Sequence, residues 1–183
     1  MATKRTLKTI RFRENTIYDI VNIHKRWLID EDEGTRAEII DFDLSKLSFN
    51  GKDLRKAIFL NCNLSGTVFD VANLEEINFK NSNLSNSSFW KTYLFGANLK
   101  NVNLSNSDLL FANMQNADLT NSILKGANFS EVNLKNTKVT TDQLIRVKSL
   151  FKTKGINTNI KNEIKRFNSK LFERDSSFGL PYK

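Results

Sequence analysis

Large apolar residues recur at every fifth position from residue 39 to residue 139, and this period excludes an ordinary helix or strand. A step of five turns an α-helix by about 140°, so the apolar residues would never form one stripe. On a flat strand, an odd step places successive residues on opposite faces. All of them can be buried only if the backbone turns a corner once in each period. We call these positions centres: Ile39, Leu44, Phe49, Leu54, Phe59, Leu64, Phe69, Leu74, Phe79, Leu84, Phe89, Leu94, Leu99, Leu104, Leu109, Met114, Leu119, Leu124, Phe129, Leu134 and Val139.

The residues around each centre follow the same period. Two positions before a centre the residue is mostly small, as at Ala57 and Ser82, and one position before it is mostly Asn or Asp. Two positions after a centre, Gly and Asn are frequent, as at Gly66 and Asn81. Gly and Asn turn tightly or tolerate positive φ. The pattern therefore predicts a solenoid of short sides joined by tight turns, with centres and small residues pointing inward.

These residues resemble the pentapeptide-repeat family, whose consensus is A(D/N)LXX. The matching segments are Ala72-Asn73-Leu74, Ala97-Asn98-Leu99, Ala112-Asn113-Met114, Ala117-Asp118-Leu119 and Ala127-Asn128-Phe129. The resemblance covers more than half of the chain. It implies an all-β fold, a right-handed, four-sided parallel β-helix with four pentapeptides in each coil and about five coils. Stacked coils then place Phe49, Phe69 and Phe89 in one ladder and Phe59 and Phe79 in the opposite one.

Helical spacing flanks the repeats, so we expect three parts: a leader over 1–36, the β-helix over 37–141 and a C-terminal cap over 142–183. The leader helix is expected to begin at Asn15 or Thr16 and to cover the first coil. After Val139 the period is expected to end, with a helix capped by Asp142 and a second helix over 158–172. A helix, a short loop and Gly-x-Arg-Ala before the first repeat look like the leader of many small bacterial and phage members of the family.

Positive charge is concentrated in the C-terminal part. Residues 142–183 hold ten Lys and Arg against four Asp and Glu, whereas residues 41–141 hold ten against nine. The candidate basic face consists of Lys161, Lys165, Arg166 and Lys170. Such a face can attract nucleic acid, an acidic protein or an anionic membrane. An amphipathic helix can equally pack on its own protein or on a second copy and leave its lysines in solvent, and we favour that alternative.

Catalysis has little support in the sequence. The chain has one histidine, one cysteine, no cluster with metal-ligand spacing and no Gly-rich phosphate loop. We expect His24 to be packed beside Trp27, and Cys62 to be a small core residue. The acidic run from Asp30 to Glu33 lacks the spacing of a calcium-binding loop. We therefore expect no enzyme activity, no metal and no cofactor.

Several apolar residues occupy positions that the period assigns to solvent. The candidate protein-binding patch consists of Trp90, Tyr93, Phe95, Leu110 and Phe111. A coil of twenty residues stacks Leu110 on Trp90, which brings all five side chains to one corner of the rod. A cluster of this kind is typical of an interaction site, although the C-terminal segment could also cover it.

The sequence favours a non-enzymatic scaffold that binds a protein partner of unknown identity, or a second copy of itself as a homodimer. The alternative comes from the family resemblance: a mimic of duplex DNA that modulates DNA gyrase or another topoisomerase. A near-neutral rod with a basic end departs from the negative surface of such mimics. With no signal peptide and no apolar run long enough to span a membrane, we expect a cytoplasmic protein. The Asn- and Lys-rich composition suits a bacterium or phage.

Overall fold

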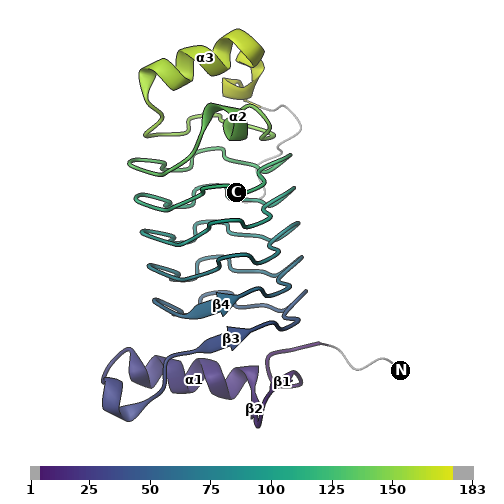
Figure 1. Ribbon diagram of the computed structural model, residues 1–183, viewed down its shortest axis with the longest axis vertical. Helices are drawn as coiled ribbons and strands as arrows, with labels where there is room; N and C mark the ends of the chain where they lie inside the picture. Colours follow the sequence, from purple (N-terminus) through teal and green to yellow (C-terminus); the bar gives the residue numbers. More distant parts are fainter. Residues whose placement is uncertain (1–4, 175–183) are drawn as a thin grey trace, which may run out of the picture.

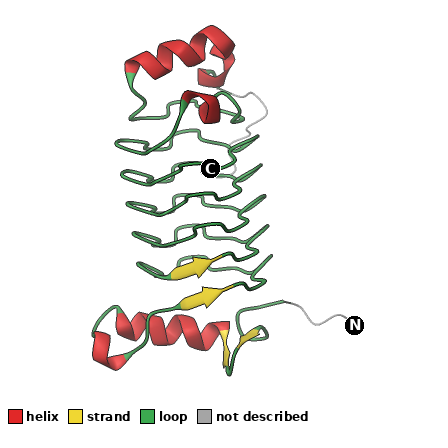
Figure 2. Ribbon diagram, viewed as in Figure 1, coloured by secondary structure: helices red, strands yellow, loops and turns green. Residues whose placement is uncertain are grey.

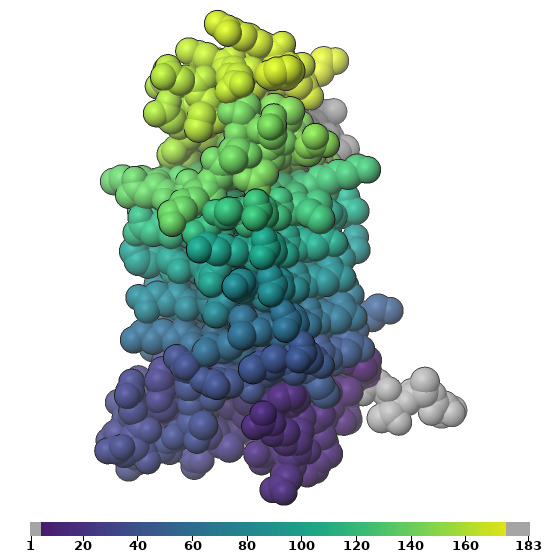
Figure 3. Space-filling model, viewed as in Figure 1, coloured from purple at the N-terminus to yellow at the C-terminus, as the bar shows by residue number. Residues whose placement is uncertain are grey.

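The chain forms a rod of stacked coils with helices at both ends (Figure 1). The structure is a computed structural model that describes residues 5–174. Each coil takes twenty residues, because Asp43 pairs in parallel with Asn63 and Asn63 pairs with Asn83. In the space-filling view, the coils form continuous layers between the two helical ends (Figure 3). The twenty-residue register agrees with a solenoid built from four pentapeptides in each coil.

Regular strands are few, because the backbone turns too often for longer ones. β3 (Glu38–Ile40) pairs in parallel with β4 (Ile58–Leu60), and elsewhere each side of a coil holds a single bridged residue. Figure 2 therefore draws most of the solenoid as loop. The backbone groups are paired nonetheless: the Leu64 N–H donates to the Asn83 carbonyl at 2.7 Å, and the Asn83 N–H donates to the Cys62 carbonyl at 2.9 Å. Successive coils are thus joined through their main chains.

The centres form the core, as the period predicts. Every centre from Ile39 to Leu134 is buried, and Val139 at the end of the run is partly buried. The rings of Phe69 and Phe89 stack with their centroids 5.2 Å apart and their planes 13° apart. Phe59 and Phe79, on another side of the coil, meet edge to face at 5.8 Å. The predicted phenylalanine ladders are therefore confirmed.

The flanking positions serve the turns. An Asn or Asp before the centre accepts a hydrogen bond from the backbone two residues on, as Asn83 Oδ1 does from the Ser85 N–H at 3.1 Å. Two residues after each centre from Ile39 to Leu134, φ is positive, for example 63° at Asn81 and 67° at Gly66. The small residues lie inside, and a buried hydroxyl among them donates to a carbonyl of the preceding coil, as Ser82 Oγ does to Phe59 O at 2.9 Å. This explains why the repeat keeps Asn or Asp beside small residues.

The N-terminal end begins with a hairpin of β1 (Arg11–Phe12) and β2 (Asn15–Thr16), followed by helix α1 (Ile17–Trp27). Thr16 is the N-cap of α1 and forms a capping box with Asp19. A short 3₁₀ helix, η1 (Glu31–Glu33), follows at the acidic run. α1 lies against the first coil (Figure 1), and its residues Ile17 and Val21 join the core.

The C-terminal end corrects one prediction, because the ladder does not stop at Val139. The helix expected from Asp142 is only the short α2 (Thr141–Leu144), with Thr140 as its N-cap. Beyond it the ladder resumes: Asn128 pairs with Ser149, and Asn133 pairs with Lys154. These partners are 21 residues apart instead of twenty, so one extra residue shifts the register. That shift breaks the five-residue period in the sequence without ending the fold.

The last elements are helix α3 (Thr158–Asn168) and the 3₁₀ helix η2 (Ser169–Phe172). Ile164 and Leu171 are buried, and the Leu150 N–H donates to the Leu171 carbonyl at 2.6 Å. Thr141 Oγ1 donates to Glu163 Oε2 at 2.9 Å, which ties α3 to α2. Phe167 follows Ile160 and Ile164 at helical spacing, which predicts a buried side chain, but it is 68% exposed.

Candidate interaction surface

The structure places the five residues of the predicted patch along one side of two neighbouring coils and not at a single corner: Trp90, Leu110 and Phe111 lie at one turn, Tyr93 on the adjoining side and Phe95 at the next turn. The Lys91 N–H donates to the Leu110 carbonyl at 3.0 Å, so Trp90 and Leu110 lie in one column, one coil apart. Phe111 follows Leu110, while Tyr93 and Phe95 lie on the next side of the Trp90 coil. The same column continues upward to Phe151, because the Glu131 N–H donates to its carbonyl at 2.7 Å.

One further residue belongs to this corner and was missed in the sequence. The Val71 N–H donates to the Trp90 carbonyl at 2.9 Å, which places Val71 one coil below Lys91 and two below Phe111. Its position, two after a centre, is one that the period assigns to solvent, so the repeat alone could have identified it. We call the following set the apolar corner: Val71, Trp90, Tyr93, Phe95, Leu110 and Phe111.

Most of the apolar corner faces solvent. Tyr93 is 50% exposed, Val71 46% and Phe111 44%, and Phe95 is also exposed. Trp90 and Leu110 are half-buried. Among the described residues, large apolar side chains in solvent are otherwise scattered over the surface. The apolar corner is therefore a cluster of the kind that marks interaction sites.

Two of these side chains also occupy strained backbone. φ is 58° at Val71 and 63° at Phe111. L-residues in the left-handed region cost about 1–2 kcal/mol, and Gly and Asn are the usual exceptions. A β-branched residue such as valine is a clear outlier there. Burial does not offset this cost, because both side chains are nearly half exposed.

Charged groups surround the apolar corner. Lys91 Nζ lies 4.3 Å from the centroid of the Trp90 ring, a cation–π contact. Asp70 Oδ1 accepts a hydrogen bond from the Trp90 N–H at 3.0 Å. The coil that holds Asp70 also carries Glu75 and Glu76, so acidic side chains lie along the lower edge of the corner.

The candidate basic face lies at the other end of the rod, on α3 and η2. Lys161, Lys165, Arg166 and Lys170 are all exposed. Lys161 Nζ and Lys165 Nζ lie 5.6 and 5.9 Å from the centroid of the Phe172 ring. Helix α3 lies across the C-terminal end of the rod, beyond the last coil (Figure 1). The tail beyond Arg174, which could also cover the corner, lies outside the described residues.

The only histidine and the only cysteine are buried and hydrogen-bonded within the fold. His24 Nδ1 accepts from the Ala37 N–H at 3.1 Å, and His24 Nε2 lies 3.0 Å from the Arg55 carbonyl, to which it donates. Burial lowers the pKa of His24, so the ring stays neutral. Burial also raises the pKa of the Cys62 thiol, which donates to the Ile39 carbonyl at 3.4 Å. A neutral, buried thiol is a poor nucleophile.

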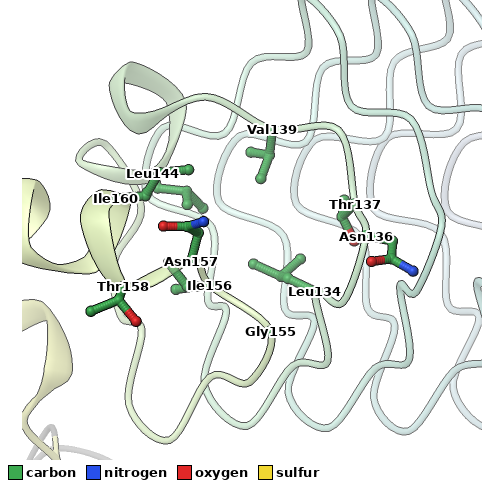
Figure 4. A pocket seen from close by; sticks show the side chains of 10 residues that line it. All are labelled: Leu134, Asn136, Thr137, Val139, Leu144, Gly155, Ile156, Asn157, Thr158 and Ile160. Carbon is green, nitrogen blue, oxygen red and sulfur yellow. The ribbon is translucent and has the colours of Figure 1, made fainter.

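A cavity of about 520 Å³ lies between the last coil and α3 (Figure 4). Leu134, Val139 and Ile160 point into it, and Asn136 and Asn157 are among its polar lining residues. No titratable side chain lines it, so it offers no general acid or base. A second cavity, of about 410 Å³, lies beside α1, and there Arg36 is paired with Glu38 at 2.6 Å.

Across residues 5–174, no three His, Cys, Asp or Glu side chains are grouped so that they could hold a metal ion. Over the same range, none of the helices has the length and apolar character needed to cross a bilayer.

Comparisons with known proteins concern the repeats. The family model "Pentapeptide repeats" matches eight copies over residues 72–109 and 112–140. A pentapeptide repeat protein from the Arabidopsis thaliana thylakoid lumen is 21% identical, with 70% of this chain and 87% of that chain covered and a TM-score of 0.52. Rfr23 from the cyanobacterium Cyanothece 51142 is 23% identical, with 66% and 86% covered and a TM-score of 0.38.

QnrB1, a plasmid-mediated fluoroquinolone resistance protein, is 13% identical, with 73% of this chain and 97% of that chain covered and a TM-score of 0.27. No curated protein matches the sequence. The similarity to the structure from the thylakoid lumen, at 21% identity, shows a shared fold and nothing about function. The eight copies identify residues 72–109 and 112–140 as pentapeptide repeats, and the chain shares its fold with the pentapeptide repeat protein of the thylakoid lumen.

Proposed function

We propose that this protein is a non-enzymatic scaffold that binds a protein partner through the apolar corner. The observation that carries the proposal is the placement of Val71 and Phe111, two large apolar residues that are exposed and sit in left-handed backbone. Neither burial nor turn geometry accounts for them, because the same turn position elsewhere in the repeats holds Asn, Gly or a charged residue suited to solvent. Strained residues persist where another requirement favours them, and binding is such a requirement.

The chemistry of the corner supports a protein as the partner. Trp90, Tyr93 and Phe111 are of the residue types that supply most of the binding energy in protein interfaces. The acidic lower edge, at Asp70, Glu75 and Glu76, favours a partner that carries apolar side chains flanked by Lys or Arg. A surface on another protein and a surface on a second copy can both meet this description.

Catalysis gains no support from the structure. His24 and Cys62 are buried and hydrogen-bonded within the fold, and the larger cavity holds no titratable group. A scaffold needs neither a reactive side chain nor a cofactor. We therefore keep the prediction that the protein is not an enzyme.

The same proposal assigns roles to the rod and to its two ends. We propose that the rod is right-handed and four-sided, with the leader 1–36 and the C-terminal part 142–183 as its caps. The continued ladder at Ser149 and Lys154 indicates that the rod itself extends beyond residue 141. A cytoplasmic location and a bacterial or phage origin remain predictions from the sequence.

The second candidate function is modulation of DNA gyrase by imitation of duplex DNA. This candidate comes from the resemblance of the repeats to the pentapeptide-repeat family. A DNA mimic competes for a basic groove and benefits from negative charge along its length. Residues 41–141 hold nine acidic against ten basic side chains, so the rod is close to neutral. The charge therefore favours the scaffold over the mimic.

The scaffold is tested with Trp90→Ala combined with Phe111→Ala. We expect the double variant to keep the fold and to lose partner binding or self-association, measured by affinity capture, direct binding to the purified partner and analytical ultracentrifugation. The matched control is Asn81→Ala with Asn101→Ala, which removes two side chains from another corner and should leave binding unchanged. Equal loss in both double variants would sink the proposal, because binding would then not depend on the apolar corner.

A supercoiling assay separates the two candidate functions. We expect the purified protein to leave gyrase supercoiling unchanged at low micromolar concentration. Strong inhibition, or protection of gyrase from a quinolone, that persists in the Trp90→Ala, Phe111→Ala variant would reverse the ranking.

A further inference from the structure

The basic face has no structural role that accounts for its charge. The apolar side of α3 is already used within the protein, because Ile164 is buried and Ile160 packs on the core. Packing of this helix therefore explains its apolar residues and leaves Lys161, Lys165 and Arg166 in solvent. Removal of like charges from this end would lower electrostatic repulsion, so their presence calls for another reason.

These cations lie together on the exposed side of α3. With 100° for each helical residue, Lys161, Lys165 and Arg166 span an arc of about 140°, and the middle of this arc lies about 130° from Ile164. No acidic residue lies in this arc, since Glu163 of α3 is bound to Thr141 on another flank. Among the described residues, no ion pair is recorded for Lys161, Lys165, Arg166 or Lys170 within the chain.

Aromatic rings accompany the cations. Phe172 lies under the ammonium groups of Lys161 and Lys165, which limits the freedom of these long side chains. Phe167 follows Arg166 in sequence, lies about 100° from it around the helix and is 68% exposed. Cations spaced along a surface next to an open aromatic face are the combination that binds single-stranded nucleic acid.

We propose that this end of the rod binds single-stranded nucleic acid without reading its sequence. Lys161, Lys165, Arg166 and Lys170 contact the phosphates, and Phe167 stacks on a base. A bilayer fits less well, because a membrane-surface helix needs a free apolar face and that of α3 is turned inward. This site is separate from the apolar corner and does not depend on the function proposed for it.

The test is fluorescence anisotropy of a labelled oligothymidylate with the full-length protein over a series of salt concentrations. We expect log affinity to fall with log salt with a slope of about −3, from about −0.7 for each of four phosphate contacts. Replacement of the four cations with Gln should lower the affinity more than tenfold at about 50 mM salt and should reduce the slope by about 3.

The matched control removes four exposed lysines from the rod: Lys46→Gln, Lys56→Gln, Lys80→Gln and Lys125→Gln. Both quadruple variants have the same net charge, so a surface-specific site predicts a large loss in the first and little in the second. Circular dichroism and thermal melts verify that each variant is folded. Equal losses would overturn the proposal, since net charge alone would then explain the binding.

Two further measurements define the ligand. Phe167→Ala should weaken binding to the single strand and leave binding to a duplex of the same length unchanged. An unchanged single-strand affinity in that variant would overturn the single-strand assignment. Vesicles of phosphatidylserine and phosphatidylcholine provide the last comparison. Binding to vesicles without binding to the oligonucleotide would show a membrane surface and would also overturn the proposal.

Discussion

Two corners of the rod share one backbone conformation and differ in what they place on it. One corner carries Asn61, Asn81 and Asn101, and each amide donates to the side chain one coil below, at 2.9, 3.1 and 2.9 Å. The apolar corner carries Val71 and Phe111 at the equivalent turn positions. φ is 63° at both Asn81 and Phe111.

The two corners show which residues the turn favours and which it only tolerates. The turn requires a residue that tolerates positive φ, and a ladder of asparagines satisfies that and adds hydrogen bonds between coils. Valine and phenylalanine meet the geometry at a cost and add no such bonds. A corner that departs from the rule therefore reports a requirement other than folding, which is why we assign binding to it.

The largest expected difference is between a phenylalanine in the core and one in the apolar corner. Phe89 is fully buried and stacks on Phe69, so Phe89→Ala should lower the free energy of unfolding by about 3–5 kcal/mol. Phe111 is 44% exposed, so Phe111→Ala should change it by less than about 1 kcal/mol. Urea melts of the two variants measure both values. Equal losses would mean that the apolar corner belongs to the core.

An exchange of residues between the two corners should give a smaller effect of opposite sign. Asn81→Val places a β-branched residue in left-handed backbone and breaks the amide ladder, and it should lower the free energy of unfolding by about 1–3 kcal/mol. Val71→Asn relieves the same strain and should raise it by about 1 kcal/mol. Thermal and urea melts serve as the measurement. A loss of stability in Val71→Asn would show that the corner is shaped by folding after all.

Much of the fold could be predicted from the sequence because the five-residue period determines where the backbone turns and which side chains point inward. The centres, the inward small residues and the positive φ two positions after each centre all follow from the five-residue period. The same frame placed Trp90 and Leu110 in one column. Val71 occupies a solvent position of the same frame, so the frame could have identified it in the same way as Phe111.

The two ends could not be predicted in the same way. Leu144 still lies on the period and Leu150 lies one residue off it, so the extra residue hides the continued ladder between them. The helical spacing of the apolar residues after Asp142 predicts a longer helix, whereas the structure resumes the coil there. Phe167 fits the apolar stripe of α3 in sequence, yet it is 68% exposed, because no neighbour in the described chain covers it.

The smallest expected effect tests whether the corners are independent of pH. Neutral amides and apolar side chains do not titrate, so acid should weaken the protein only through its ionisable groups. Asp118 is one of them: burial alone would raise its pKa, but Thr120, Lys138 and Lys100 together hold the pKa well below its ordinary value. The stability that Asp118 contributes is therefore lost only in stronger acid, once the pH falls below the ordinary pKa range of an aspartate, where this residue becomes protonated in the unfolded chain. Between pH 7.5 and 5.5 the relevant group is His24.

Burial lowers the pKa of His24 below its ordinary value of 6.5. The unfolded chain therefore takes up a proton below about pH 6.5 while the folded chain does not, so stability falls as the pH falls. At pH 5.5 the loss is at most about 1.4 kcal/mol, the value for a ring that stays neutral when folded. Urea melts at the two pH values should show this loss in the wild type and equally in Asn81→Val, and not in His24→Gln. The same loss in His24→Gln would assign the acid sensitivity to another group, and a larger loss in Asn81→Val would show that the asparagine corner is coupled to that end of the rod.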